Sequence, residues 1–268
     1  MSEFVTENDV EAYERDGAVC LRGVFSGWID KIAAGIEMNL REPGPYGAEN
    51  RRKGQSGSFF DDYCNWTRIA EFEDVVRHSP AAETAAAIMR SKSAQFFHDH
   101  VLVKEPGTQT TTPWHQDLPY YFTEGTQMVS FWVPADPVRE ATLRFIAGSH
   151  KWDKLVLPVR WIDDGRFYAS EDEYLPVPDP ENEPDRYKIV EWSLEPGDAV
   201  LFDFRTVHGA RENMTGARRR AFSMRWLGDD VRYCQRPGRT SPPFPGHDMQ
   251  VGERLRDDWF PVVWPQQG

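Results

Sequence analysis

Two short polar motifs, far apart in the chain, restrict what this sequence can fold into. His115 and Asp117 lie two residues apart, and His208 follows 91 residues after Asp117. Two imidazoles and one carboxylate in this order are typical of a mononuclear non-heme iron(II) site that leaves one face of the ion open. The fold must therefore bring two distant segments of the chain together.

The residues around the first motif favour an extended backbone. Residues 110–112 are β-branched threonines, and Pro113 restricts the residue before it to extended geometry. Residues i and i+2 of a strand project from one face, so His115 and Asp117 are expected to reach one ion while Gln116 points away. A His-x-Asp tripeptide alone is more often a surface pair than a pair of metal ligands. The second motif, which supplies a third ligand, favours the metal site.

The second motif follows a predicted buried strand. Residues 194–198 are typical of a turn, and the apolar run 199–204 predicts a strand that carries His208 toward the interior. Gly209 permits close approach of another backbone. A core histidine bonded to a backbone carbonyl is the alternative, and it would be preferred if His208 stood alone.

A further strand is predicted at residues 219–227, where alternation puts Arg219 and Arg220 on opposite faces. One arginine should therefore point inward. A buried guanidinium requires an anionic partner, and a carboxylate matches its fork. Three consecutive arginines also occur at solvated strand ends, but the spacing from His208 makes a carboxylate-bearing cosubstrate plausible.

Five segments carry a resemblance to a known family. In chain order they are Trp114–Tyr121, Phe131–Pro134, Ala147–Lys151, Glu195–Asp198 and His208–Ala221. With them the chain resembles the phytanoyl-CoA hydroxylase family of iron(II)- and 2-oxoglutarate-dependent dioxygenases. The resemblance implies a mainly β fold with flanking α-helices around a double-stranded β-helix, the jelly-roll or cupin-like core. Short strands separated by Pro, Gly and Asp turns from Ser93 onward agree with it.

The resemblance also implies roles for individual residues. His115, Asp117 and His208 would be the Fe(II) ligands. Arg219 would bind the distal carboxylate of 2-oxoglutarate, with Arg220 as the alternative in the neighbouring register. Dioxygen would be the second cosubstrate, an aliphatic carbon of a small molecule would be hydroxylated, and succinate and CO2 would be released. A halogenase is disfavoured, because halogenating relatives carry a small residue in place of the carboxylate.

Two positions depart from the family pattern. Residues 140–146 lack the usual glycine, which leaves the shape of that pocket edge open. Ala210 stands where relatives often carry serine, so one hydrogen bond to 2-oxoglutarate is expected to be missing.

Other residues are candidates for the pocket. On the predicted strand 94–103, His98 and His100 share a face with Lys104, and Lys104 could meet an anionic substrate or cosubstrate. As a second metal site the two histidines would need further ligands, so a place at the pocket border is preferred. His150 is expected to be structural. The remaining candidates are Trp132 beside the cosubstrate and, in the substrate pocket, Gln116, Tyr120, Tyr121 and Phe202.

The chain is expected to form a single domain, with a mainly helical lead-in (1–92), a jelly-roll core (93–230) and a C-terminal extension (231–268). Helices are predicted from Thr6 to about Arg15, after a cap at Ser26, and from Ser79-Pro80 to about Arg90. The apolar segment 259–264 should either fold onto the barrel or form a dimer contact. The oligomeric state itself is not readable.

Composition agrees with a soluble enzyme. Of 268 residues, 40% are hydrophobic, which provides an ample core, yet no apolar run reaches the roughly 20 residues of a membrane helix. The N-terminus does not resemble a signal peptide, so a cytoplasmic location is expected. A net charge of −12 argues against nucleic acid and anionic membranes as partners.

Two long loops are candidates for substrate selection. Loop 41–58 contains Arg51-Arg52-Lys53, and loop 161–186 has nine acidic residues against two arginines. If the basic run faces the pocket, an anionic substrate is favoured. If the acidic loop faces it, a cationic or neutral substrate is favoured. Simple solvated connections are an equally good interpretation.

Three other functions remain open at this point. The same iron site could serve desaturation, epimerisation or ring formation. A jelly-roll protein could bind metal without turnover. A zinc hydrolase could use the same three ligands, although it would leave Arg219 without a role.

Overall fold

The computed structural model describes residues 3–51, 57–159, 167–168 and 173–265. Four α-helices occur in these ranges: α1 (Glu7–Asp16), α2 (Ile29–Arg41), α3 (Ala70–His78) and α4 (Ala81–Ile88). Two short 3-10 helices are η1 (Leu118–Tyr120) and η2 (Ser149–Lys151). The strands are β1 (Ala18–Leu21), β2 (Ala48–Asn50), β3 (Phe59–Tyr63), β4 (Ala94–Lys104), β5 (Thr112–His115), β6 (Thr123–Glu124), β7 (Met128–Pro134), β8 (Leu143–Ile146), β9 (Ile189–Glu191), β10 (Ala199–Asp203), β11 (His208–Ala210), β12 (Arg219–Leu227), β13 (Arg232–Tyr233) and β14 (Val262–Trp264).

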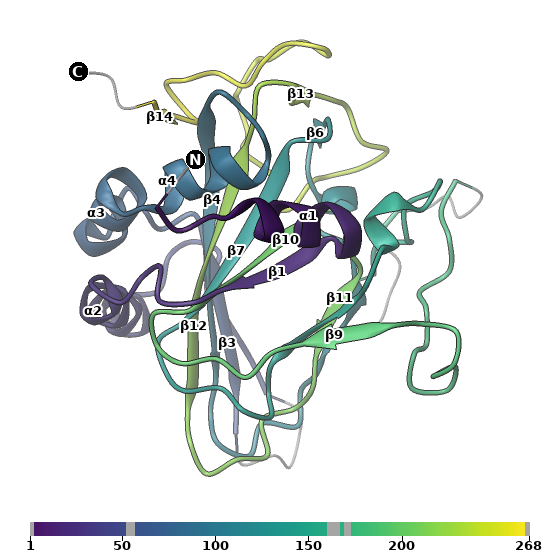
Figure 1. The fold of residues 1–268 in the computed structure, drawn as a ribbon. Helices are drawn as coiled ribbons and strands as arrows, with labels where there is room; N and C mark the ends of the chain where they lie inside the picture. Colours follow the sequence, from purple (N-terminus) through teal and green to yellow (C-terminus); the bar gives the residue numbers. More distant parts are fainter. Residues whose placement is uncertain (1–2, 52–56, 160–166, 169–172, 266–268) are drawn as a thin grey trace.

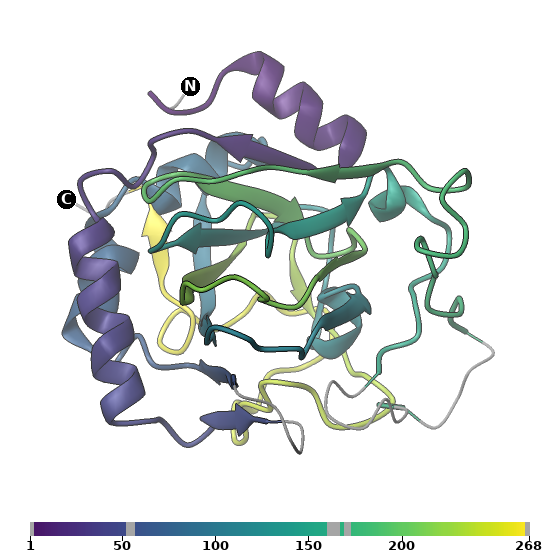
Figure 2. The ribbon, with the colours of Figure 1, turned by 90° about the horizontal axis from the view of Figure 1, so that it is seen from below.

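Two antiparallel sheets form the framework (Figures 1 and 2). The described strands of the large sheet run in the order β1-β10-β7-β12-β4-β3-β2, and β14 also pairs with β4. The small sheet has the order β5-β11-β8-β9. Phe59, Trp132 and Phe202 of the large sheet share one apolar cluster with Leu143 and Phe145 of the small sheet. The two sheets thus face each other across a core, as the jelly-roll prediction requires.

Helices α2, α3 and α4 cover the outer face of the large sheet, on the side away from β9 and β11, while α1 lies along β1 at the edge of that sheet (Figures 1 and 2). Alternation explains this second core, because Val101, Phe222 and Met224 point outward from their strands and pack against Ile36 and Phe72 of α2 and α3. The Phe72 and Phe222 rings stack with centroids 4.2 Å apart. The central strands β4, β7, β10 and β12 of the large sheet therefore bury both faces.

The predicted helix after Thr6 is confirmed. Thr6 and Asp9 form a reciprocal capping box, and Gly17 ends the helix with φ +79°, a conformation that favours glycine. The cap predicted at Ser26 is wrong, because α2 starts later, from Trp28, without a side-chain cap. The third predicted helix is α4, and α3, which precedes it, was not predicted.

Both ends of the chain contribute strands to the sheets. The lead-in contributes strands β1, β2 and β3, so the sheets recruit residues before 93. In the C-terminal extension, β14 pairs with β4 and Phe260 is fully buried. The apolar C-terminal segment therefore folds onto the large sheet. Across the described ranges, no helix has the length and apolar character needed to span a membrane.

Candidate metal centre

His115 is the last residue of β5, and the strand does not continue to Asp117. Asp117 has helical backbone angles, φ −72° and ψ −41°, and directly precedes η1. The prediction that both side chains project from one strand face is therefore wrong. A turn after the strand brings the carboxylate back toward the imidazole, with Asp117 Oδ1 3.7 Å from His115 Nε2.

The small sheet supplies the third member of the cluster. His208 opens β11 and stands opposite His115 in the antiparallel register, with ring centroids 4.2 Å apart. The strands approach closely at Gly209, where a Cβ atom would lie 2.9 Å from the Thr112 carbonyl oxygen. One ligand atom each of His115, Asp117 and His208 lies within 4.8 Å of the others, and all three residues are buried.

Hydrogen bonds orient both imidazoles toward the common centre. Nδ1 of His115 lies 2.8 Å from the Pro113 carbonyl oxygen, and Nδ1 of His208 lies 3.0 Å from that of Thr206. Each Nδ1 therefore carries the proton, which leaves Nε2 with its lone pair facing the cluster. Burial lowers the pKa of His208 and lowers that of His115 to about 3, so both rings are neutral at pH 7.

Asp117 offers one free oxygen to the centre. Its Oδ2 accepts a hydrogen bond from Ser130 Oγ at 2.8 Å and one from Arg225 Nη2 at 3.4 Å. Burial alone would raise the pKa of Asp117, but the Arg225 guanidinium and the hydrogen bond from Ser130 hold it well below its ordinary value. The carboxylate is thus ionised with Oδ1 available, and two neutral imidazoles and one carboxylate oxygen are a donor set that suits iron(II).

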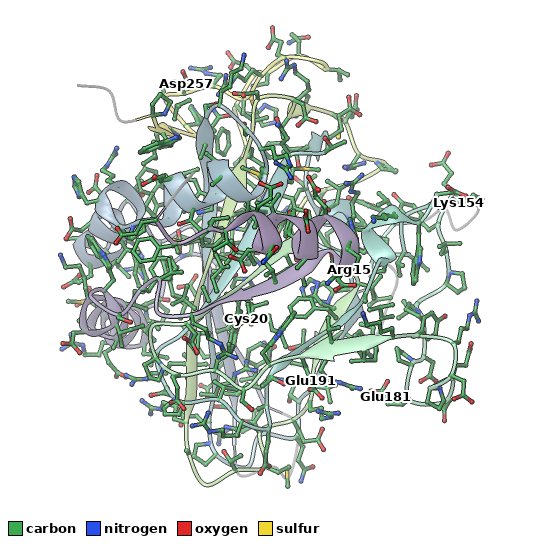
Figure 3. The ribbon with its side chains drawn as sticks, in the orientation of Figure 1. Arg15, Cys20, Lys154, Glu181, Glu191 and Asp257 are labelled. Atoms are coloured by element: carbon green, nitrogen blue, oxygen red, sulfur yellow. The ribbon has the colours of Figure 1, made fainter. Side chains whose placement is uncertain are left out.

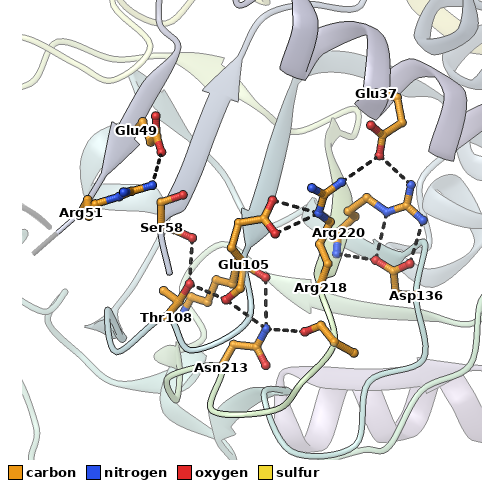
Figure 4. Close-up of polar contacts among 12 residues, drawn as sticks. Glu37, Glu49, Arg51, Ser58, Glu105, Thr108, Asp136, Asn213, Arg218 and Arg220 are labelled. Atoms are coloured by element: carbon orange, nitrogen blue, oxygen red, sulfur yellow. Dashed lines mark hydrogen bonds and ion pairs between the residues drawn. The ribbon is translucent and has the colours of Figure 1, made fainter. Parts of the chain in front are cut away.

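Arg219 and Arg220 differ sharply in their surroundings. Arg220 lies on the outer side, where it forms ion pairs with Asp136 (2.7 Å) and Glu37 (2.9 Å), as Figure 4 shows. Arg219 points inward, is 4% exposed and donates from Nη1 to the Ala141 carbonyl. Its Nε has no hydrogen-bond partner among the described residues, and burial lowers its pKa to about 10.

Trp132 and Lys104 both adjoin Arg219. The Arg219 guanidinium carbon lies 5.3 Å from the centre of the Trp132 ring, and Trp132 Nε1 also lacks a hydrogen-bond partner within the described ranges. Lys104 stands opposite Arg219 in the register and donates to the Arg211 carbonyl at 3.0 Å. Arg219 Nε and Trp132 Nε1 are thus two buried donors without an acceptor among the described residues, and a carboxylate could accept from both.

A pocket of about 480 Å³ opens beside His115 and Asp117. Among the predicted residues, it is lined by Tyr120, Tyr121 and His100, and His98 is a further wall residue. The remaining lining comes from distant segments. Its members are Tyr46, Ala48, Asn50, Asp61, Tyr63, Val159, Phe167, Arg225, Ser241 and Pro242.

Two predicted pocket residues do not belong to this lining. The Gln116 amide bonds within the protein, since Nε2 donates to the Arg205 carbonyl and Oε1 accepts from Val156 N–H. Phe202 lies in the core between the sheets, with its ring centroid 4.5 Å from that of His208. His150, expected to be structural, has Nε2 3.2 Å from the Glu14 carbonyl oxygen.

Both long loops contribute to the pocket. Tyr46, Ala48 and Asn50 come from loop 41–58, and Phe167 comes from loop 161–186. Of the basic run, Arg52 and Lys53 lie outside the described residues, as do positions 161–166 and 169–172 of the acidic loop. In its described part, Glu181 binds Arg144, which also approaches Glu191; Figure 3 labels both glutamates.

Sequence reasoning missed Arg225. It lies 5% exposed on the inward face of β12, on the same alternation as Arg219, and contacts both Asp117 and Tyr121. Extending that alternation along the predicted strand would have placed it inside. No local pattern identifies Ser130 as the partner of Asp117.

The chain is similar in sequence to a known dioxygenase. Dioxygenase lolE1 of Epichloe uncinata is 24% identical over 231 residues, which cover 81% of this chain and 80% of that protein.

Solved structures share the fold. The non-heme alpha-ketoglutarate-dependent carbocyclase SnoK from nogalamycin biosynthesis superposes with a TM-score of 0.75 at 20% identity, covering 98% of this chain and 99% of that one. The epimerase SnoN in complex with Fe3+, alpha-ketoglutarate and nogalamycin RO superposes with a TM-score of 0.75 at 21% identity, covering 96% of this chain and 98% of that one. EctD from S. alaskensis with 2-oxoglutarate and 5-hydroxyectoine superposes with a TM-score of 0.68 at 17% identity, covering 90% of this chain and 82% of that one. The predicted double-stranded β-helix is thereby confirmed.

A family match extends over most of the chain. Residues 13–221 match the model of the phytanoyl-CoA dioxygenase family, and this range contains His115, Asp117, His208 and Arg219. The chain therefore belongs to the phytanoyl-CoA dioxygenase family.

Proposed function

We propose that this protein is an Fe(II)- and 2-oxoglutarate-dependent dioxygenase that hydroxylates an aliphatic carbon of a small organic substrate. His115, Asp117 and His208 hold the iron. The observation that carries the proposal is the convergence of their three ligand atoms within 4.8 Å, each with its other polar atom hydrogen-bonded elsewhere. When bound, iron(II) with 2-oxoglutarate and O2 supplies oxidative decarboxylation to succinate and CO2, coupled to insertion of one oxygen atom into a C–H bond.

Arg219 binds the distal carboxylate of 2-oxoglutarate in this proposal. Arg219 Nε and the Trp132 indole N–H are two buried donors without acceptors among the described residues, and an anionic ligand would remove the cost of leaving them unpaired. Lys104 Nζ is a further buried donor beside them, and burial together with the Arg219 charge lowers the pKa of Lys104 well below its ordinary value. Arg220 is not assigned this role, because its donors already bind Asp136 and Glu37.

The other candidate functions explain less. A zinc hydrolase or a metal-binding protein without turnover gives Arg219 and Trp132 no ligand. Epimerisation or ring formation, the activities of the epimerase SnoN and the carbocyclase SnoK, would use the same residues, so product analysis separates them from hydroxylation. Cytoplasmic location and a single domain stay predictions from the sequence.

Anaerobic absorption spectroscopy tests the proposal. Protein loaded with iron(II) and titrated with 2-oxoglutarate should develop a visible metal-to-ligand charge-transfer band, and His208→Ala should abolish it. The absence of a band in wild-type protein that demonstrably holds iron would contradict 2-oxoglutarate chelation. If the band forms, substrate-dependent release of succinate is the assay for turnover.

A further inference from the structure

Two residues of the pocket each bury a polar atom that has no hydrogen-bond partner among the described residues. They are His98 on β4, through Nε2, and Arg225 on β12, through Nη1. The two residues stand opposite each other in the strand register, and both line the pocket that contains His115 and Asp117. His98 is 2% exposed and Arg225 is 5% exposed, so solvent does not readily replace the missing partners.

His98 presents an acceptor. Its Nδ1 lies 3.1 Å from the Asp99 carbonyl oxygen, so the ring proton resides on Nδ1 and Nε2 keeps its lone pair. Burial lowers the pKa of His98 well below its ordinary value, which keeps the ring neutral. The Tyr121 ring packs edge-on against the imidazole at 5.1 Å and holds its plane.

Arg225 presents a donor. Its Nε donates to the Tyr121 hydroxyl at 3.2 Å, and its Nη2 donates to Asp117 Oδ2 at 3.4 Å. These contacts fix the guanidinium plane from two sides. Because arginine has no acceptor atoms, the remaining Nη1 can only donate.

The charges around the pair disfavour an anion there. Asp117 already offsets the charge of Arg225, and Asp61 adds a second carboxylate to the pocket wall. The lone pair of His98 Nε2 would also repel a carboxylate oxygen. A hydroxyl group suits both atoms, because its oxygen accepts from Arg225 while its hydrogen is donated to His98.

The rest of the pocket wall suits an uncharged molecule with apolar faces. Tyr46 and Tyr63 stack with centroids 4.7 Å apart, and Tyr120 and Phe167 pack edge-on at 4.9 Å. All four rings line the pocket. Aromatic rings of this kind cover C–H surfaces, while the polar pair fixes orientation.

We propose that Arg225 Nη1 and His98 Nε2 together bind a hydroxyl group of a neutral substrate beside the metal centre. The substrate class is an alcohol with an apolar ring or chain. This assignment rests on the proposed function, because the same pocket would hold the carbon that is oxidised. The pair selects and orients the substrate, and the Arg225–Asp117 ion pair connects it to a residue that would hold the iron.

Three matched compounds test the proposal: cyclohexane-1,2-diol, its dimethyl ether and cyclohexanecarboxylate. Binding is measured by anaerobic isothermal titration calorimetry on the protein with iron(II) and 2-oxoglutarate. The diol should bind about tenfold more tightly than the ether, which can accept from Arg225 but cannot donate to His98. The carboxylate should bind more weakly than the diol. Equal binding of diol and ether, no binding of the diol, or preference for the carboxylate would each overturn the assignment.

Variants of His98 complete the test, since changing Arg225 would also disturb Asp117. In His98→Phe the preference for diol over ether should fall to about one, and His98→Gln, which restores an acceptor near Nε2, should recover it. His247→Phe is the matched control, because His247 packs against Phe122 outside the pocket lining and the substitution should leave the preference unchanged. Retention of the preference in His98→Phe would contradict the role of His98.

The charge-transfer band is recorded on the same samples. A normal band with no diol preference would reject the hydroxyl site and leave the proposed function standing. A missing band in iron-loaded protein would reject the proposed function itself, whatever the calorimetry shows.

Discussion

Arg219 carries a charge that the described part of the protein leaves without a carboxylate partner. Burial lowers its pKa to about 10, which is the direction expected when no nearby anion supports the charged form. Its neighbours Arg218 and Arg220 point outward and are neutralised by Glu37, Glu105 and Asp136 (Figure 4). At the scale of single residues, this difference separates a candidate ligand-binding arginine from two that stabilise the surface.

Arg219→Ala is therefore expected to weaken 2-oxoglutarate binding. The concentration giving half of the charge-transfer band should rise about 10- to 100-fold, because a charge-assisted hydrogen-bonded pair contributes about 1.5–3 kcal/mol. Arg220→Ala is the matched control and should leave that concentration nearly unchanged. The reverse pattern would move the carboxylate site to the outer face of β12.

The C-terminal strand shows how an element at the end of the chain can stabilise the core. β14 pairs with β4, and Gln95 of β4 donates to the carbonyl oxygens of Leu255 and Phe260. Phe260 is fully buried and packs against Phe97, Phe122 and Phe244. The segment thus packs against the start of β4 and contributes Phe260 to the core.

Phe260→Ala should lower the free energy of unfolding by about 3–5 kcal/mol, because it leaves a cavity among aromatic rings. Urea denaturation measures the change, with Val251→Ala as a control at a position that is 63% exposed. The control should stay within about 0.5 kcal/mol of wild type. If Phe260→Ala altered only the size distribution in gel filtration, the segment would be an oligomer contact instead.

Several buried groups make the stability of the whole molecule depend on pH. Burial lowers the pKa of His98, His115 and His208, so they stay neutral in the folded protein. In the unfolded chain histidine titrates near 6.5, so below that pH the unfolded state binds more protons and folding stability falls. For His115 this window extends down to about pH 3. Burial raises the pKa of Asp99 to about 6, above its unfolded value of 3.8. Between these two pH values the folded state binds the extra proton, so Asp99 stabilises the fold on acidification and offsets part of the loss.

The metal-free protein should therefore lose stability on mild acidification. Between pH 6.5 and pH 5 the free energy of unfolding should decrease by about 1–3 kcal/mol per pH unit, since each net proton contributes about 1.4 kcal/mol per unit. Urea titrations in the presence of a chelator give the slope. The slope should be shallower in His98→Phe, and stability that increased on acidification would contradict neutral buried imidazoles.

Much of this protein could be read from the sequence, because the relevant signals are local or repeat with a short period. The helix cap at Thr6 and the alternation that turns Arg219 inward depend on residues a few positions apart. The pairing of His115 with His208 was anticipated from the motif order and the family resemblance. Their adjacency in the sheet gives that expectation a geometric basis.

Only the tertiary structure decided the rest. Asp117 reaches the centre from a turn, Gln116 is held by the Arg205 carbonyl and the Val156 amide, and Arg225 meets Asp117 from a strand over 100 residues away. These arrangements arise from contacts between segments that no short sequence period relates. The pocket is likewise lined by residues of two loops, Tyr46 and Phe167 among them, that lie far apart in the sequence. Local sequence therefore determined the ligand types and the inward and outward alternation of the core strands, and long-range packing determined which side chains face one another.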